Sequence, residues 1–113
     1  MYQPITQLEL RPGLSVDRHK LTALCQHWKI AKLELFGSVL RDDFRDDSDI
    51  DFLVTWQANS RRDLFELVAM HEDFSQLFDR RVDLVSRKSI ETSHNFLRQA
   101  AILGTAQPFY PEP

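Results

Sequence analysis

The sequence predicts an α/β fold in which a small mixed β-sheet is packed by helices, and three patterns support this prediction. Short apolar segments typical of strands occur at residues 30–36, 49–56 and 82–85. Segments with apolar residues at helical spacing lie before, between and after them, at about residues 16–28, 64–79 and 89–103. A chain of 113 residues has room for one domain with one modest core.

Composition and charge exclude several classes of protein. The chain is 42% hydrophobic and 27% charged, as expected of a globular protein. It carries 14 Lys and Arg against 17 Asp and Glu, and this net charge of −3 argues against a protein that wraps long nucleic acid. With Cys25 as its single cysteine, it forms no internal disulfide. No apolar run approaches the roughly 18 residues of a membrane span, and the first residues lack a secretory signal, so we expect a cytoplasmic protein.

The N-terminal part is expected to lead into the first helix. Residues 1–14 contain two prolines and a glycine and predict an extended arm or loop, residues 15–110 the folded domain, and residues 111–113 a tail. Ser15 is a candidate N-cap. Four apolar side chains then share one helical face: Leu21, Leu24, Cys25 and Trp28.

The first strand is expected to be half buried, because Leu33 and Leu35 alternate with Lys32 and Glu34. Gly37-Ser38 ends this strand, and a short helical turn follows to about Phe44. The charged run that comes next is interpreted as a solvated loop.

The remaining elements follow from similar patterns. The segment from Ser60 to Asp63 approximates a capping box for the long middle helix. The helix itself carries a stripe formed by Leu64, Leu67, Val68, His71, Phe74 and Phe78. One last helical region is predicted from Ser89 to Leu103, with a brief edge strand at Phe109 and Tyr110. We interpret the pairs Arg61-Arg62 and Arg80-Arg81 as solvated helix ends, with contact to an acidic or RNA-bearing partner as the alternative.

Three aspartates in apolar strands indicate a metal site. Asp49 and Asp51 are two residues apart on a strand, so they project from the same face about 7 Å apart and repel unless a cation lies between them. Mg²⁺ fits, because it prefers hard oxygen ligands and shares them with substrate phosphates. Asp83 lies between apolar residues of its own strand, where a buried carboxylate needs a partner. If the third strand pairs with the second, Asp83 joins the other two, and three carboxylates can hold two metal ions.

The turn at Gly37-Ser38 supplies groups that bind phosphate. Glycine permits a tight turn and a close approach of the backbone to a ligand. The Ser38 hydroxyl and the free N–H groups after it can donate to a triphosphate, and Arg41 can reach phosphate oxygens with its planar fork. With the aspartates, this arrangement predicts nucleotidyl transfer, in which Asp83 is the candidate base or base-assistant for the attacking hydroxyl.

The same residues carry a resemblance to a known family. Gly37-Ser38, ten further residues and then Asp49-Ile50-Asp51 resemble the signature of the DNA polymerase beta-like nucleotidyltransferase superfamily, and the longer match from Phe36 to Val54 resembles its minimal nucleotidyltransferase (MNT) domains. The resemblance implies the nucleotidyltransferase fold. It also implies Asp49, Asp51 and Asp83 as metal ligands, Gly37 and Ser38 as the triphosphate turn, and Arg41 as the helix arginine.

The resemblance further implies a biological role. MNT proteins are typically antitoxins paired with a HEPN-domain ribonuclease toxin in a hetero-oligomer, and members with an intact site transfer AMP from ATP to a tyrosine of that toxin. Two alternatives remain open. The chain could inhibit the toxin by binding alone, or it could modify a small molecule such as an aminoglycoside, although such enzymes use a further domain to shape the acceptor pocket.

Overall fold

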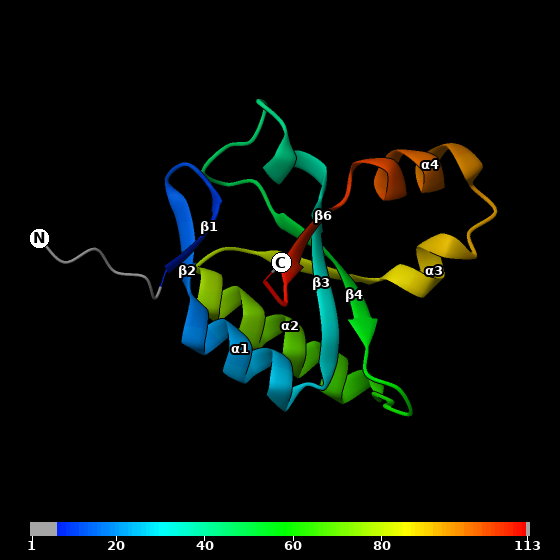
Figure 1. Cartoon of the computed structure of the whole chain (residues 1–113), viewed down its shortest axis with the longest axis horizontal. Helices are drawn as coiled ribbons and strands as arrows, with labels where there is room; N and C mark the ends of the chain where they lie inside the picture. Colours follow the sequence, from blue (N-terminus) through cyan, green and yellow to red (C-terminus); the bar gives the residue numbers. More distant parts are fainter. Residues whose placement is uncertain (1–6, 113) are drawn as a thin grey trace, which may run out of the picture.

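The computed structural model describes residues 7–112, and it confirms the predicted mixed sheet packed by helices (Figure 1). The elements are, in order, β1 (Gln7–Arg11), β2 (Leu14–Asp17), α1 (Arg18–His27), β3 (Ile30–Phe36), the 3₁₀ helix η1 (Gly37–Leu40), β4 (Ile50–Trp56), α2 (Leu64–Phe78), β5 (Val82–Ser86), α3 (Arg87–Glu91), α4 (Phe96–Thr105) and β6 (Gln107–Tyr110).

The main sheet has the strand order β5-β4-β3-β6. Strand β3 runs antiparallel to both of its neighbours, β4 and β6, whereas β4 and β5 are parallel. Parallel neighbours need a crossover connection, and α2 provides it. The β4-α2-β5 unit therefore places the start of β5 beside the start of β4, as the sequence analysis required for Asp83.

Helices cover both faces of the sheet, but to different extents. Helices α1 and α2 pack on one face and enclose the main core (Figure 1). That core includes Leu21, Cys25, Leu33, Leu35, Ile50, Phe52, Val54, Met70, Phe74 and Phe78. On the other face, α3 and α4 cover a smaller cluster around Phe36, Leu53 and Ile90. The alternation along β4 is confirmed, because Ile50, Phe52 and Val54 face the main core.

The segment before α1 differs from the predicted arm or loop. Residues 1–6 lie outside the described part of the chain, but β1 and β2 form an antiparallel hairpin that pairs Gln7 with Asp17. Gly13, with a φ of +83°, turns the chain between the two strands. The N-cap is also different from the prediction: Asp17, not Ser15, accepts a hydrogen bond from the Lys20 N–H at 3.0 Å.

Two helical predictions were wrong in detail. The predicted helix from Ser89 to Leu103 is divided into α3 and α4, since Asn95 caps a new helix by accepting from the Arg98 N–H at 3.1 Å. The capping box of α2 lies three residues later than predicted, and joins Asp63 to Glu66. The predicted stripe of α2 is buried at Phe74 and Phe78, but Leu64 and Val68 near its start are exposed.

Other elements begin or end near their predicted positions. The helical turn after β3 is an exception, because η1 stops at Leu40 instead of continuing to about Phe44. Cys25 is buried and unpaired, and burial raises the pKa of its thiol to about 12, so it is an unreactive core residue. In residues 7–112, no helix combines the length and the hydropathy that a bilayer span requires.

Glu34 was expected on a polar face of β3, yet only 5% of it is exposed. Helix α3 covers it and places Arg87 Nη1 at 2.7 Å from Glu34 Oε1. The same guanidinium bonds Glu91 Oε2 through its Nε at 3.0 Å. A buried carboxylate is tolerated only with such a partner, so this ion pair ties α3 to the sheet.

We expect Arg87→Ala to lower the free energy of unfolding by about 2–3 kcal/mol, because it leaves the buried Glu34 carboxylate without its closest partner. Glu91→Ala, which removes the more exposed carboxylate from the same guanidinium, should cost about 0.5 kcal/mol or less. Urea unfolding of both variants would measure the difference. An equal decrease in the free energy of unfolding in the two variants would show that burial of Glu34 does not depend on Arg87.

Candidate active site

Two of the predicted carboxylates are register partners on neighbouring strands. Asp51 of β4 pairs with Asp83 of β5, so their side chains project side by side from one face of the sheet. The next pair on this face, Leu53 and Val85, belongs to the cluster under α3 and α4. The condition that the third strand pairs with the second is therefore met, and the carboxylates lie just beyond the helices that cover this face.

Asp49 completes the group from the residue before β4. It is partly exposed, and its Oδ1 accepts a hydrogen bond from Arg81 Nε at 3.0 Å. Asp83 was expected to be buried between its apolar neighbours, but 55% of its side chain is exposed. The neighbours Val82 and Leu84 face the main core, whereas Asp83 projects from the opposite face of β5, which is an edge strand of the sheet.

The turn after β3 lies directly against these carboxylates. Phe36, the last residue of β3, pairs with Asp51 across the antiparallel ladder, and Gly37 follows with a φ of +78°. A Cβ at Gly37 would lie 3.3 Å from Asp51 Cγ and closer still to its Oδ2. Glycine is thus required here twice, for the backbone conformation and for the approach of Asp51.

Ser38 and Arg41 lie on the segment that leaves this turn. Ser38 is the second residue of η1, and its carbonyl accepts from the Arg41 N–H at 2.9 Å. The Arg41 side chain is 59% exposed, and its Nε lies 3.1 Å from Asp43 Oδ1. A groove of about 650 Å³ opens between η1 and α4, and its lining includes Gly37, Arg41 and Gly104. The turn therefore has open space beside it.

The surroundings of Asp51 disfavour its charged form. Burial, followed by the charges of Asp83 and Asp49, raises the pKa of Asp51 to about 6, while Arg41 acts in the opposite direction. Such a group of like charges is costly without a counterion. A cation at this end of the sheet would remove that cost.

The donor atoms suit a hard divalent cation, although they are not yet gathered around one position. Within residues 7–112 no three His, Cys, Asp or Glu side chains are arranged to hold a metal. Asp49 is turned toward Arg81, whose side chain is 80% exposed, and such exposed ion pairs contribute only about 0–1 kcal/mol. Asp49 could therefore leave Arg81 at little cost, and three carboxylates are the ligands that Mg²⁺ prefers.

His71 lies near Asp83, but its ring makes its hydrogen bonds to the backbone. Its Nε2 is 4.0 Å from Asp83 Oδ1 and accepts from the Leu84 N–H at 3.3 Å. Its Nδ1 must donate to the Leu67 carbonyl at 2.8 Å, because a carbonyl can only accept. Both ring nitrogens of His71 are therefore engaged by backbone groups.

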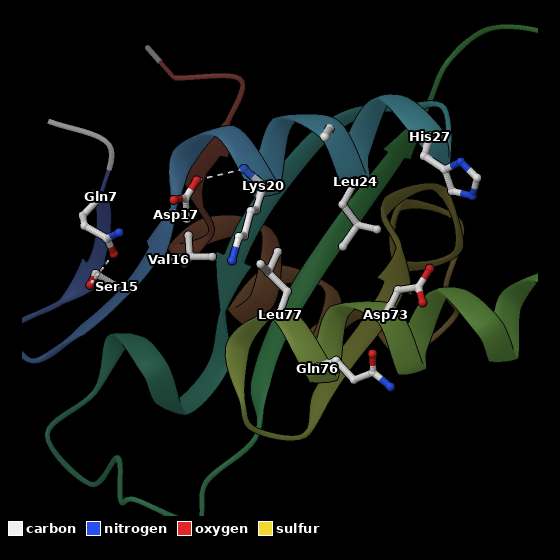
Figure 2. Close-up of a pocket in the computed structure, with 11 residues that line it drawn as sticks. Gln7, Ser15, Val16, Asp17, Lys20, Leu24, His27, Asp73, Gln76 and Leu77 are labelled. Atoms are coloured by element: carbon white, nitrogen blue, oxygen red, sulfur yellow. Dashed lines mark hydrogen bonds between the residues drawn. The ribbon is translucent and has the colours of Figure 1, made fainter. Parts of the chain in front are cut away.

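A second groove, of about 790 Å³, lies on the other side of the sheet between α1, α2 and β2 (Figure 2). Its two carboxylates already have structural roles: Asp17 caps α1, and Asp73 accepts from Trp28 Nε1 at 3.0 Å. The carboxylates at the sheet end face away from α1 and α2, so we assign no chemistry to this groove.

The structure also brings in residues that the sequence analysis had not placed at the site. Arg81 contacts Asp49, and Arg80 bonds the backbone of the loop before it. The sequence had marked this arginine pair as a helix end or partner contact. The hydrogen bond to Asp49 is made over a separation of 32 residues, so no local pattern could have revealed it.

Comparison with known proteins gives consistent matches. The nucleotidyltransferase domain family matches residues 18–103, a range that includes all six predicted site residues. Two proteins of Methanocaldococcus jannaschii, named as candidate protein adenylyltransferases, are 30% and 29% identical to this chain over 77 residues, which is 68% of the chain and 76% of each relative.

Solved structures show the same fold. A structure described as a candidate minimal nucleotidyltransferase aligns with a TM-score of 0.59 and 30% identity, over 80% of this chain and 87% of the other. A toxin–antitoxin structure with AMP-PNP aligns with a TM-score of 0.61 and 22% identity, over 81% of this chain and 71% of the other. At this lower identity, the second match shows a shared fold.

We expect Gly37→Ala to lower the free energy of unfolding by at least about 2 kcal/mol, because the added methyl group meets Asp51 and the positive φ is unfavourable. Gly104→Ala is the matched control, since a Cβ there has no atom within 4 Å. In α4 that change should instead stabilise by about 0.5–1 kcal/mol. Urea unfolding should show a decrease in the free energy of unfolding for Gly37→Ala and an increase for Gly104→Ala.

We expect Asp51→Asn to stabilise the metal-free protein at pH 8. The folded pKa of about 6 lies above the ordinary 3.8, so this group contributes most stability at low pH and loses it as the pH rises through 6. After allowance for solvent screening, the variant should gain about 1–2 kcal/mol at pH 8 and nothing near pH 4.

The measurement is urea unfolding in EDTA from pH 4 to pH 8, with Asp42→Asn as the control for an exposed carboxyl in the loop before β4. The control should change stability by no more than about 0.5 kcal/mol at either pH. A loss of stability in Asp51→Asn at pH 8 would mean that the carboxylate is not strained by its neighbours.

Proposed function

Since the chain belongs to the nucleotidyltransferase domain family, we propose that it is an antitoxin that transfers AMP from ATP to a tyrosine hydroxyl of a cognate HEPN-type ribonuclease toxin. The register pairing of Asp51 with Asp83 beside Gly37 is the observation that carries the proposal. It joins a group of acidic ligands to a turn that a phosphate chain can approach. The relatives named as protein adenylyltransferases, and the fold shared with a toxin–antitoxin structure, favour a protein acceptor.

In the proposed reaction the chain first binds and orients the triphosphate. The Ser38 hydroxyl donates to phosphate oxygens, and the missing side chain of Gly37 lets them approach Asp51. The exposed Arg41 can exchange Asp43 for a phosphate, which its planar fork recognises better than a lysine would. These contacts hold the α-phosphorus near the carboxylates.

Asp49, Asp51 and Asp83 would hold two Mg²⁺ ions, which when bound supply the positive charge that stabilises an in-line displacement at phosphorus. The side chain of Asp83 is 55% exposed, against 38% for that of Asp49. It can therefore accept the proton of the incoming hydroxyl. The tyrosine oxygen bonds to the α-phosphorus, the bond to the β-phosphate oxygen breaks, and pyrophosphate leaves.

The partner and the cellular setting are also part of the proposal. The chain is expected to form a hetero-oligomer with its toxin in the cytoplasm, and the acceptor is supplied by that partner. One observation favours the alternative of an antitoxin that acts by binding alone. Asp49 contacts Arg81, so the three carboxylates do not converge on one metal position. That contact is exposed and weak, and we therefore place catalysis first.

The experiment is incubation with ATP labelled at the α-phosphate, Mg²⁺ and the HEPN-type protein expected from the reading frame beside this gene. Label should appear on a tyrosine of that protein, and ATP labelled at the γ-phosphate should give none. Asp51→Ala should reduce transfer at least about a hundredfold while the complex still forms. Glu72→Ala, which removes an exposed carboxylate of α2, should leave transfer unchanged.

The same assay separates the alternatives. A stable complex without label would identify an antitoxin that acts by binding alone. Label on an aminoglycoside but not on the protein would identify a small-molecule nucleotidyltransferase.

A further inference from the structure

The loop from residue 41 to residue 49 contains no helix or strand, although the site depends on it. It begins after the turn at Gly37 and Ser38 and ends at Asp49. Backbone without regular hydrogen bonds has its position set by contacts with the rest of the molecule. The contacts of this loop therefore determine how the phosphate turn lies relative to the first carboxylate.

Phe44, in the middle of the loop, is held by two arginines from separate parts of the fold. The guanidinium carbon of Arg11, on β1, lies 4.6 Å from the centre of the Phe44 ring. The guanidinium carbon of Arg80, in the connection from α2 to β5, lies at the same distance. A cation over an aromatic ring at this distance is attracted by its negative face. We call these three residues the Phe44 stack.

Each arginine also fixes the loop backbone. Arg11 Nη1 donates to the carbonyls of Val39 at 3.0 Å and Arg41 at 2.9 Å. Arg80 Nη1 donates to the carbonyls of Arg45 at 2.9 Å and Ser48 at 2.8 Å. Arg11 thus holds the start of the loop, next to η1, and Arg80 holds its end, next to Asp49.

These contacts account for the use of arginine. Among the described residues, neither Arg11 nor Arg80 has a carboxylate oxygen within 4 Å, and both contact the Phe44 ring and backbone carbonyl groups. A planar guanidinium can stack on a ring and donate sideways to two carbonyls at once. The ammonium of lysine keeps the charge but cannot make both contacts in that geometry.

We propose that Arg11, Phe44 and Arg80 are positioning residues for nucleotide binding: the Phe44 stack fixes the loop so that the phosphate turn and Asp49 face the same ligand. The inference rests on the proposed function in taking that ligand to be ATP with Mg²⁺. It gives the N-terminal hairpin a role, because β1 supplies Arg11. It also places Arg80 with the site although it touches no substrate.

The first test is the affinity for a fluorescent ATP analogue in Mg²⁺. Arg11→Lys, Arg80→Lys and Phe44→Leu should each weaken binding about tenfold, because each loses ring and backbone contacts that hold the loop. Phe44→Tyr keeps the aromatic face and should restore affinity to within about twofold. The matched control is Arg62→Lys, which disrupts a similar stack on Trp56, with 4.8 Å from guanidinium to ring centre, at the opposite end of β4.

A double-mutant cycle distinguishes positioning from general destabilisation. If the arginines act through Phe44, Arg11→Lys should weaken binding by less than about threefold in the Phe44→Leu background, instead of tenfold. Hydrogen exchange provides a readout without nucleotide. In Phe44→Leu the hydrogen-bonded amides of Arg41, Arg45 and Ser48 should exchange at least about tenfold faster, whereas those of α4 should not change.

The outcomes separate this inference from the proposed function. A wild-type chain that binds no ATP analogue overturns the proposed function, and with it any role of the stack in ATP binding. If the wild type binds and the three variants bind equally well, or if Arg62→Lys weakens binding as much as they do, the Phe44 stack does not position the site. The inference would also be overturned if Arg11→Lys weakened nucleotide binding by the same factor with and without Phe44→Leu.

Discussion

The parallel pairing of β4 with β5 is the constraint on which the site depends. Its register sets Asp51 beside Asp83, and the antiparallel pairing of β3 brings Gly37 against the same carboxylate. Helix α2 makes this register possible, because parallel strands need a crossover and α2 packs that crossover onto the core. The end of the sheet thus combines acidic ligands with a turn that has room for phosphate.

This arrangement of like charges is unfavourable without a cation, and burial together with the neighbouring carboxylates raises the pKa of Asp51. The surrounding structure must therefore hold the carboxylates together. The main core secures β4 and β5 from one face, the ion pair of Glu34 and Arg87 ties α3 to the other, and the Phe44 stack fixes the loop before Asp49. Strain at a functional site is tolerated only where the rest of the fold compensates for it.

Much of the fold could be predicted, because strand alternation and helical spacing are local signals. The strands β3, β4 and β5, the helices α1 and α2 and the edge strand β6 are near their predicted positions. The errors fall where distant contacts outweigh local preference. Glu34 is buried because Arg87 reaches it across 53 residues, and the last helix is divided where Asn95 caps a new one. The segment before α1 is a hairpin because its strands pair with each other and its side chains pack on the core.

By itself, the sequence determined the chemistry that is present: three aspartates in apolar strands, a Gly-Ser turn and a chain that belongs to the nucleotidyltransferase domain family. The tertiary structure decided how these groups meet. It showed that Asp83 is exposed instead of buried, that Asp49 is turned toward Arg81, and that Arg11 and Arg80 meet on Phe44. The physical reason is that these contacts join residues about 30 or more positions apart, and their geometry depends on packing and register rather than on local sequence.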